Sequence, residues 1–140
     1  MTIRDQHLDT VAPVLATFYI HQTDSVDDLK DDDIGSAVTL TDSNEIGLIS
    51  NGDLLLGKLI SLTLTDADNG DRLATVQLGG ICRLPVSATV PEVGDRVVGG
   101  ADGAVRQAPA LTGYDPAGGS IGRGTVLAAN GTTDCVILLN

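Results

Sequence analysis

Four Asx-Gly dipeptides separate the apolar runs of this chain, and they constrain its fold more than any other feature. They are Asn51-Gly52, Asn69-Gly70, Asp102-Gly103 and Asn130-Gly131. Asn and Asp tolerate positive φ and Gly has no Cβ to oppose it, so each dipeptide favours a tight reversal between antiparallel strands. Four such turns in 140 residues predict a meandering all-β domain.

Runs with a period of two flank these turns, which is the pattern of half-buried strands. Strands are predicted over 37–41, 45–49, 54–65, 72–78, 81–86, 95–98, 104–107, 121–129 and 134–139. No ten-residue segment has a helical period, so little helix is expected. The fold class predicted is a small antiparallel β barrel or sandwich with an extended N-terminal arm, in which the last strand, 135–139, is buried.

Side-chain alternation assigns faces to two of these strands, and one glycine pair follows them. In 54–65 the predicted apolar face carries Ile60, Leu62 and Leu64. In 72–78 the inward residues are predicted to be Ala74, Val76 and Leu78, with Thr75 and Gln77 outward. Gly79-Gly80 then predicts a bulge or a sharp corner.

Residues 1–35 differ in composition from the rest of the chain. The apolar run 11–20 is interrupted by Pro13, and six Asp lie between Asp24 and Asp33. Proline demotes a run to an edge strand or an arm, and an Asp-rich run suits a solvated loop. We expect an N-terminal arm and acidic linker over 1–35 and a β-barrel or sandwich domain over 36–140. The alternative is an ordinary first strand followed by a surface loop.

The apolar run of the arm is the candidate partner-binding segment. It holds two of the three aromatic residues of the chain. The residues predicted to pack against a neighbouring subunit or another protein are Val11, Val14, Leu15, Phe18, Tyr19 and Ile20. In the alternative, they complete the barrel of their own chain.

Charge and cysteine content limit the classes of partner and the compartment. With 19 acidic against 8 basic residues the formal charge is −11, and no Lys/Arg cluster offers a phosphate-binding surface, so no nucleic-acid partner is expected. No run approaches the ~20 apolar residues of a membrane span. The first residues are too polar for a signal peptide, which predicts synthesis in a cytosol. There, Cys82 and Cys135 are expected to be buried free thiols; the alternative is a disulfide formed after release from the cell.

The motifs that could carry chemistry are incomplete. The 66–71 segment lacks the Gly and Glu positions of a calcium loop, and 118–124 lacks the Gly-Lys-Ser/Thr of a phosphate loop. His7 and His21 are far in sequence from both cysteines, which disfavours a zinc site. A Gly-x-Ser-x-Gly nucleophile elbow is absent. The prediction is a protein without catalytic residues, cofactor or metal.

Five segments in residues 36–140 resemble the capsid cement, or head decoration, proteins of tailed bacteriophages. They are 44–49 (NEIGLI), 74–85 (ATVQLGGICRLP), 93–98 (VGDRVV), 122–127 (GRGTVL) and 134–139 (DCVILL). The second segment and those after it follow the family's order of a V-x-L-x-G-[VI]-x-x-[LV]-P strand, a G-D-x-[VL] segment, a G-x-[AV]-L strand and a final [VI]-x-L strand.

This resemblance implies a virion structural protein that binds the outside of the capsid and stabilises it. The implied partner is the major capsid protein, and the implied location is the virion exterior after synthesis in the host bacterial cytoplasm. A homo-oligomer is expected, most readily a trimer near threefold positions, because self-association protects exposed strand edges. The alternatives are a small ligand- or carbohydrate-binding β module of a phage particle and, third, a small hydrolase.

Overall fold

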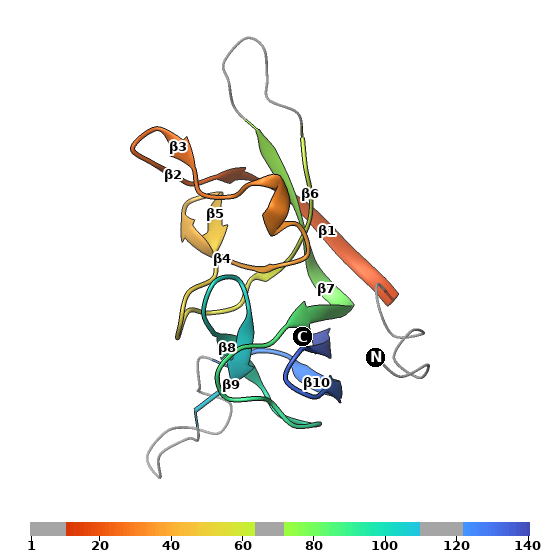
Figure 1. Ribbon diagram of the computed structural model, residues 1–140. Helices are drawn as coiled ribbons and strands as arrows, with labels where there is room; N and C mark the ends of the chain where they lie inside the picture. Colours follow the sequence, from red (N-terminus) through yellow and green to blue (C-terminus); the bar gives the residue numbers. More distant parts are fainter. Residues whose placement is uncertain (1–10, 64–71, 110–121) are drawn as a thin grey trace.

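The computed structural model describes residues 11–63, 72–109 and 122–140, which fold into strands and one 3₁₀ turn at Asp31–Asp33 (Figure 1). The strands are β1 Val11–Ile20, β2 Gln22–Thr23, β3 Val26–Asp27, β4 Ala37–Asp42, β5 Glu45–Leu48, β6 Gly57–Leu62, β7 Leu73–Pro85, β8 Val97–Gly99, β9 Val105–Gln107, β10 Thr125–Asn130 and β11 Asp134–Leu139. Within these ranges no helix has the length and apolar character needed to cross a membrane.

Five strands close into a small barrel. The order is β1-β5-β4-β6-β7, and β7 pairs back with β1, which closes the ring of strands. The all-β class and the small barrel are confirmed. The sheet is mixed and not purely antiparallel, because β1 and β5 run parallel. Residues 21–44, which include β4, connect these two strands and give the chain the length to return in the same direction.

The long strand β7 serves two apolar cores. One edge of β7 pairs first with β6, through Ala74–Gln77, and then with β11, through Gly80–Pro85. The barrel core consists of Ile20, Leu29, Val38, Ile46, Leu59, Ala74 and Val76. The second core consists of Ala37, Ile49, Leu55, Cys82, Leu84, Val86, Val97, Val105, Val126, Cys135, Ile137 and Leu139.

The C-terminal strand β11 lies between β7 and β10 and is almost wholly buried, as predicted for 135–139. The predicted irregularity at Gly79-Gly80 is also present, although both glycines lie inside the continuous β7. Gly80 has φ +87°, a conformation that favours glycine, and the pairing of β1 with β7 shifts register opposite Gly79.

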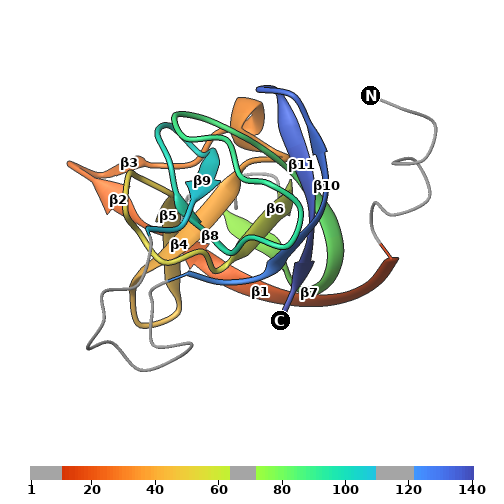
Figure 2. The same ribbon diagram turned by 90° about the horizontal axis from the view of Figure 1, so that it is seen from below.

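Residues 11–35 belong to the barrel. β1 pairs with β7 and β5 of its own chain, and Figure 2 shows β1 following β7 along its length. Leu29, in the segment expected to be a solvated linker, is fully buried in the barrel core. The chain therefore adopts the alternative of a first strand for Val11–Ile20, and the packing is continuous across residue 35. Residues 1–10 lie outside the described residues.

The Asx-Gly turns had different outcomes. Asp102-Gly103 closes the β8–β9 hairpin and Asn130-Gly131 closes β10–β11, as predicted. Asn51-Gly52 is a turn but not a hairpin, because β5 and β6 both pair with β4 and not with each other. Asn69-Gly70 lies outside the described residues. A further hairpin, β2–β3, turns at Asp24-Ser25, where two non-glycine residues have positive φ.

The predicted alternation of inward and outward side chains is wrong at two positions. In β6 a register shift between Leu59 and Ser61 places Leu59, and not Ile60, in the barrel core. Gln77 was predicted to point outward but is fully buried. It lies between Leu15 of β1 and Lys58 of β6, directly opposite both.

Gln77 compensates for an irregularity in β1. Its amide Nε2 donates to the carbonyls of Gly79 and Ile81, at 3.0 and 3.2 Å. Pro13 has no N–H to donate, and the β1–β7 register shifts between Val11 and Val14, opposite this part of β7. A side-chain amide thus supplies donors where the ladder is interrupted.

Arg123 joins the two halves of the molecule. Its Nη1 donates to the carbonyls of Leu55 and Leu56, just before β6, and its Nη2 donates to the carbonyl of Leu78. Leu78 lies between the last β7 residue that pairs with β6 and the first that pairs with β11. The guanidinium therefore satisfies backbone groups in the gap between the two ladders. Burial lowers the pKa of Arg123 from its ordinary value, which is the cost of placing the charge there.

Replacing Arg123 should loosen this junction. Arg123→Leu leaves three backbone carbonyls without their donor, so the free energy of unfolding should fall by about 2–4 kcal/mol. Urea unfolding followed by circular dichroism measures this. Arg96→Leu is the matched control: Arg96 is exposed and donates to one carbonyl, that of Gly122, so its loss should cost about 0.5–1 kcal/mol. Equal costs for the two variants would contradict the assigned role of Arg123.

Candidate interaction surface

The two faces of β1 are buried to different degrees. On the inward face burial increases along the strand, from half-buried Ala16 and Phe18 to buried Ile20, whereas Val14, which precedes a register shift, is exposed. On the other face Leu15, Thr17 and Tyr19 all remain exposed. We call these three residues the outer strip. Leu15 and Tyr19 are 52% and 51% exposed, which is a large apolar surface for a strand that closes a barrel.

One edge of β1 also lacks a partner within the described ranges. β7 pairs with β1 from Val11 to Tyr19, but β5 reaches the other edge only at Tyr19 and Ile20. The preceding part of that edge, 11–18, presents backbone N–H and C=O groups that no described strand takes up. An open edge beside apolar side chains is the arrangement that strand addition uses.

The structure divides the six predicted partner-binding residues. Val14, Leu15 and Tyr19 are exposed and available for contact. Phe18 packs against the barrel core and Ile20 is part of it, so these two complete the chain's own barrel. Val11 lies at the start of β1, and its side chain is outside the described part. The same strand therefore closes the barrel with one face and leaves the other uncovered.

A pocket opens at the seam where β1 meets β5. It has a volume of about 380 Å³, and we call it the seam pocket. Its lining residues are Tyr19, Ile20, His21, Gln22, Asp27, Ser43, Glu45 and Arg72. Tyr19 belongs to both the outer strip and the pocket wall, so the two features form one continuous surface.

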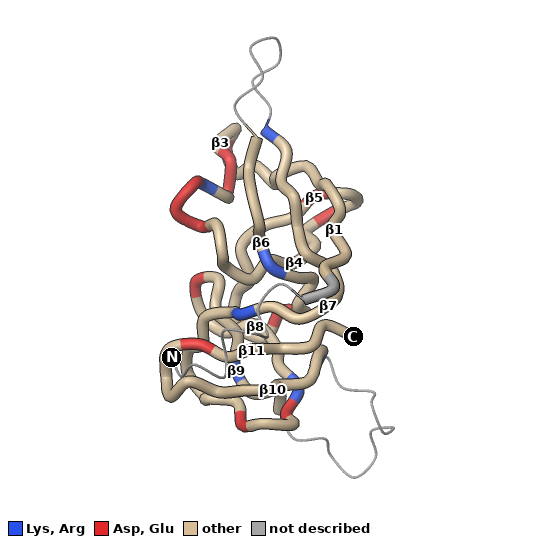
Figure 3. The backbone as a smooth tube through the Cα atoms, turned by 90° about the vertical axis from the view of Figure 1, so that its right-hand side faces the viewer, with Lys and Arg blue, Asp and Glu red and all other residues tan. Residues whose placement is uncertain are grey.

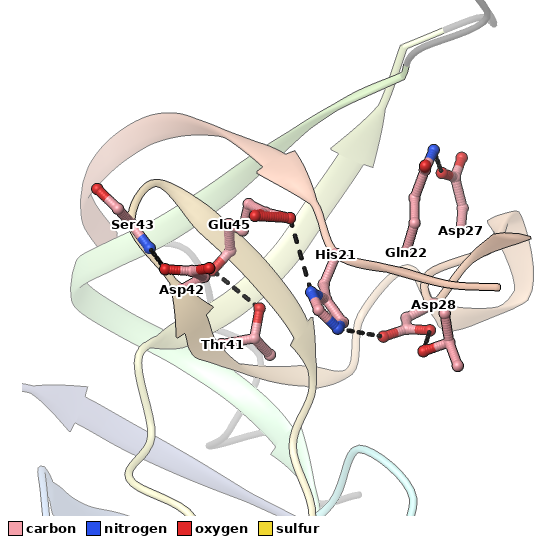
Figure 4. Close-up of polar contacts among 9 residues, drawn as sticks. His21, Gln22, Asp27, Asp28, Thr41, Asp42, Ser43 and Glu45 are labelled. Carbon is pink, nitrogen blue, oxygen red and sulfur yellow. Dashed lines mark hydrogen bonds and ion pairs between the residues drawn. The ribbon is translucent and has the colours of Figure 1, made fainter. Parts of the chain in front are cut away.

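Backbone bonds fix His21 at the pocket between two carboxylates (Figure 4). The His21 N–H donates to the carbonyl of Ile46, and the His21 carbonyl accepts from the N–H of Asp28. The imidazole Nδ1 then lies 3.6 Å from Glu45 Oε1, and Nε2 lies 4.0 Å from Asp28 Oδ2. Both distances are too long for hydrogen bonds, and Nδ1 is buried without a hydrogen-bond partner among the described residues.

The arginine that lines the seam pocket, Arg72, is already paired with a carboxylate. Arg72 Nη2 forms an ion pair of 2.7 Å with Asp31 Oδ1, and Arg72 Nε donates to the carbonyl of Thr63. Around it the β2–β3 hairpin and the following turn are rich in Asp, as the red segments near β3 in Figure 3 show. The electrostatic balance of this end of the barrel is negative.

Sequence reasoning found the apolar strand but missed the seam pocket. His21 and Asp27 fell in the expected linker, and Glu45 in a separate strand. They meet because β1 and β5 pair in parallel, with Tyr19 opposite Glu45. Such a pairing between strands far apart in sequence leaves no local pattern. Across the described ranges, no three His, Cys, Asp or Glu side chains are grouped so that they could hold a metal ion. The 66–71 and 118–121 motifs and His7 lie outside those ranges.

In comparisons with known proteins, no family model, no curated protein and no solved structure matches this chain.

The two cysteines give a direct test of the second core. Both are buried and neither forms a disulfide, and burial raises the pKa of Cys135 to about 12, with the neighbouring Cys82 adding to the shift. Because the thiolate is the reactive form, we expect neither thiol of the native protein to react with Ellman's reagent at neutral pH. Both should react at once in guanidinium chloride. Rapid labelling of the native protein would show that the second core opens readily.

Proposed function

We propose that this chain is a capsid decoration protein of a tailed bacteriophage, which binds the outside of the shell and stabilises it. The observation that carries the proposal is the outer strip on β1, exposed beside an open strand edge. The sequence resemblance of residues 36–140 to the cement proteins supplies the class of partner, the major capsid protein. Its location is then the virion exterior, following synthesis in the host bacterial cytoplasm.

The geometry suits a binding role of this kind. A cement protein needs a rigid body and a surface that bridges subunits, and it needs no catalytic group. Here Phe18 and Ile20 anchor β1 in the barrel core, so the outer strip is held in place before docking. Pre-organisation of this kind reduces the conformational entropy lost on binding. Several copies on one shell then act together through avidity, and we propose a trimer near threefold positions.

The alternative, a ligand- or carbohydrate-binding module, rests on the seam pocket alone. Sugar sites generally use aromatic platforms, and Tyr19 is the one aromatic side chain that lines this pocket within the described ranges. The outer strip would then have no role. Capsid docking accounts for both the strip and the open edge, and we favour it for that reason.

Substitution of an exposed strip residue separates docking from folding. Leu15→Asp should leave the barrel folded, since Leu15 is exposed, but it places a charge in the proposed contact. Burying a leucine contributes about 1.5–3 kcal/mol, so the affinity for shells should fall about tenfold or more. Co-sedimentation with empty shells of the same phage measures this, with thermal unfolding as the check on folding.

Val93→Asp is the matched control. Val93 is exposed to a similar or greater degree and lies between β7 and β8, away from β1. Its substitution introduces the same charge and should leave shell binding unchanged. If Leu15→Asp bound as well as the native protein, or if Val93→Asp lost binding equally, the outer strip would not be the docking surface.

Salt distinguishes apolar docking from charge-guided docking. Exposed charges are screened within about 8–10 Å at physiological salt, whereas apolar burial is not. We expect the occupancy of shells to change little between about 0.05 and 0.5 M NaCl, because the strip supplies most of the contact. A steep loss of occupancy over this series would mean that the Asp-rich segment, and not the strip, provides the attraction.

A further inference from the structure

The seam pocket lies at the end of the outer strip, so a segment that docks along the strip reaches it. Tyr19 is the last residue of the strip and the first of the pocket wall, and half of its surface is exposed. Leu15 and Tyr19 are separated by two strand repeats on one face. An extended partner chain that covers Leu15 with an apolar side chain therefore brings a later side chain to the pocket.

The pocket contains a carboxylate that lacks a hydrogen-bond donor. The Glu45 side chain is 34% exposed, and the nearest side-chain nitrogen to it is His21 Nδ1 at 3.6 Å, beyond hydrogen-bond range. Among the described residues nothing donates a hydrogen bond to this carboxylate. A partly buried carboxylate in this state has lost some of its hydration without replacement, so a donor that enters the pocket gains more here than at a fully exposed acid.

The remaining wall also selects for positive charge. Asp27, on β3, contributes a second carboxylate, of which Gln22 Nε2 occupies one oxygen at 2.9 Å. Arg72, the one Lys or Arg among the described residues of the wall, is paired with Asp31. An aromatic ring completes the wall, and rings of this type attract cations over their faces.

We infer that the seam pocket binds an arginine side chain of the partner, with the guanidinium stacked against Tyr19 and donating to Glu45. The guanidinium is favoured over an ammonium group because it is planar, stacks on aromatic faces and offers a fork of donors to a carboxylate. The partner segment is thus an extended strand with an apolar residue for Leu15 and an arginine for the pocket. This inference rests on the proposed function for the identity of the partner, but the pocket chemistry can be measured without it.

A small probe tests the pocket directly on the full chain. Nα-acetyl-arginine methylamide is titrated into ¹⁵N-labelled protein, and amide shifts are followed by NMR. We expect saturable shifts confined to residues 19–22, 27 and 43–46. The citrulline analogue has the same shape without the charge and should bind about tenfold more weakly. Equal binding of the two probes, or shifts spread evenly over all Asp-rich segments, would overturn the inference.

Two variants of equal charge change locate the site. Glu45→Gln removes the proposed acceptor charge and should weaken arginine binding at least about fivefold, since charge-assisted hydrogen bonds are roughly twice as strong as neutral ones. Glu92→Gln removes an exposed carboxylate between β7 and β8 and should have no effect. Unchanged binding in Glu45→Gln would overturn the inference even if the wild-type protein binds arginine.

The outcomes separate this inference from the proposed function. Shell binding that depends on Leu15, together with no arginine-specific shifts, would reject the pocket inference and leave capsid docking intact. Arginine-specific shifts that depend on Glu45, together with no shell binding, would reject the capsid as partner and retain the pocket as a cation site. Glu45→Gln should also weaken shell binding by the same factor as it weakens probe binding, and an unaffected shell affinity would contradict the proposed arginine in the partner.

Discussion

Both cores of the molecule depend on the continuity of β7. A single strand of 13 residues supplies Ala74 and Val76 to the barrel core and Cys82 and Leu84 to the second core. Along one edge of β7 the partner strand changes from β6 to β11. Backbone groups in the gap between these two partners would have no hydrogen bonds from the ladders. Arg123 supplies the missing donors from β10's side of the sheet. The junction is therefore polar and half-buried, and the apolar cores on either side of it are separate.

The opposite edge of β7 explains why β1 can have two roles. Pairing with β7 along most of its length fixes β1 without help from β5, which reaches only its last two residues. Phe18 and Ile20 then fill the barrel while Leu15 and Tyr19 stay in solvent. β1 is paired with β7 along one edge and packed against the barrel core on one face. Most of its other edge and the outer strip therefore remain accessible. β1 closes the barrel of its own chain, as in the alternative prediction, and the docking that we propose uses the surface that this closure leaves exposed.

The sequence predicted those features that depend on neighbouring residues. Positive φ at Asp102, Gly103 and Gly131 produced two of the predicted hairpins, and alternation placed Ala74 and Val76 inside. The sequence-based prediction was wrong where pairing with a strand far away in sequence altered the local pattern. Gln77 is buried because β1 and β6 flank it, Ile60 is displaced by a bulge against β7, and Asn51-Gly52 turns without a hairpin because β4 separates the adjacent strands. The seam pocket depends wholly on such a distant pairing, between Tyr19 and Glu45.

The central position of β11 affects the order in which the chain can fold during synthesis. Among the described strands β11 is translated after all the others, yet it pairs with β7 on one side and β10 on the other and gives Cys135, Ile137 and Leu139 to the second core. The five barrel strands, β1, β4, β5, β6 and β7, all precede it, so the barrel can close while the ribosome is still elongating the chain. The second core stays open, with its apolar face and a strand edge in contact with solvent, until residues 134–139 have left the exit tunnel. Until then a nascent chain is most exposed to wrong strand pairing at the C-terminal half of β7.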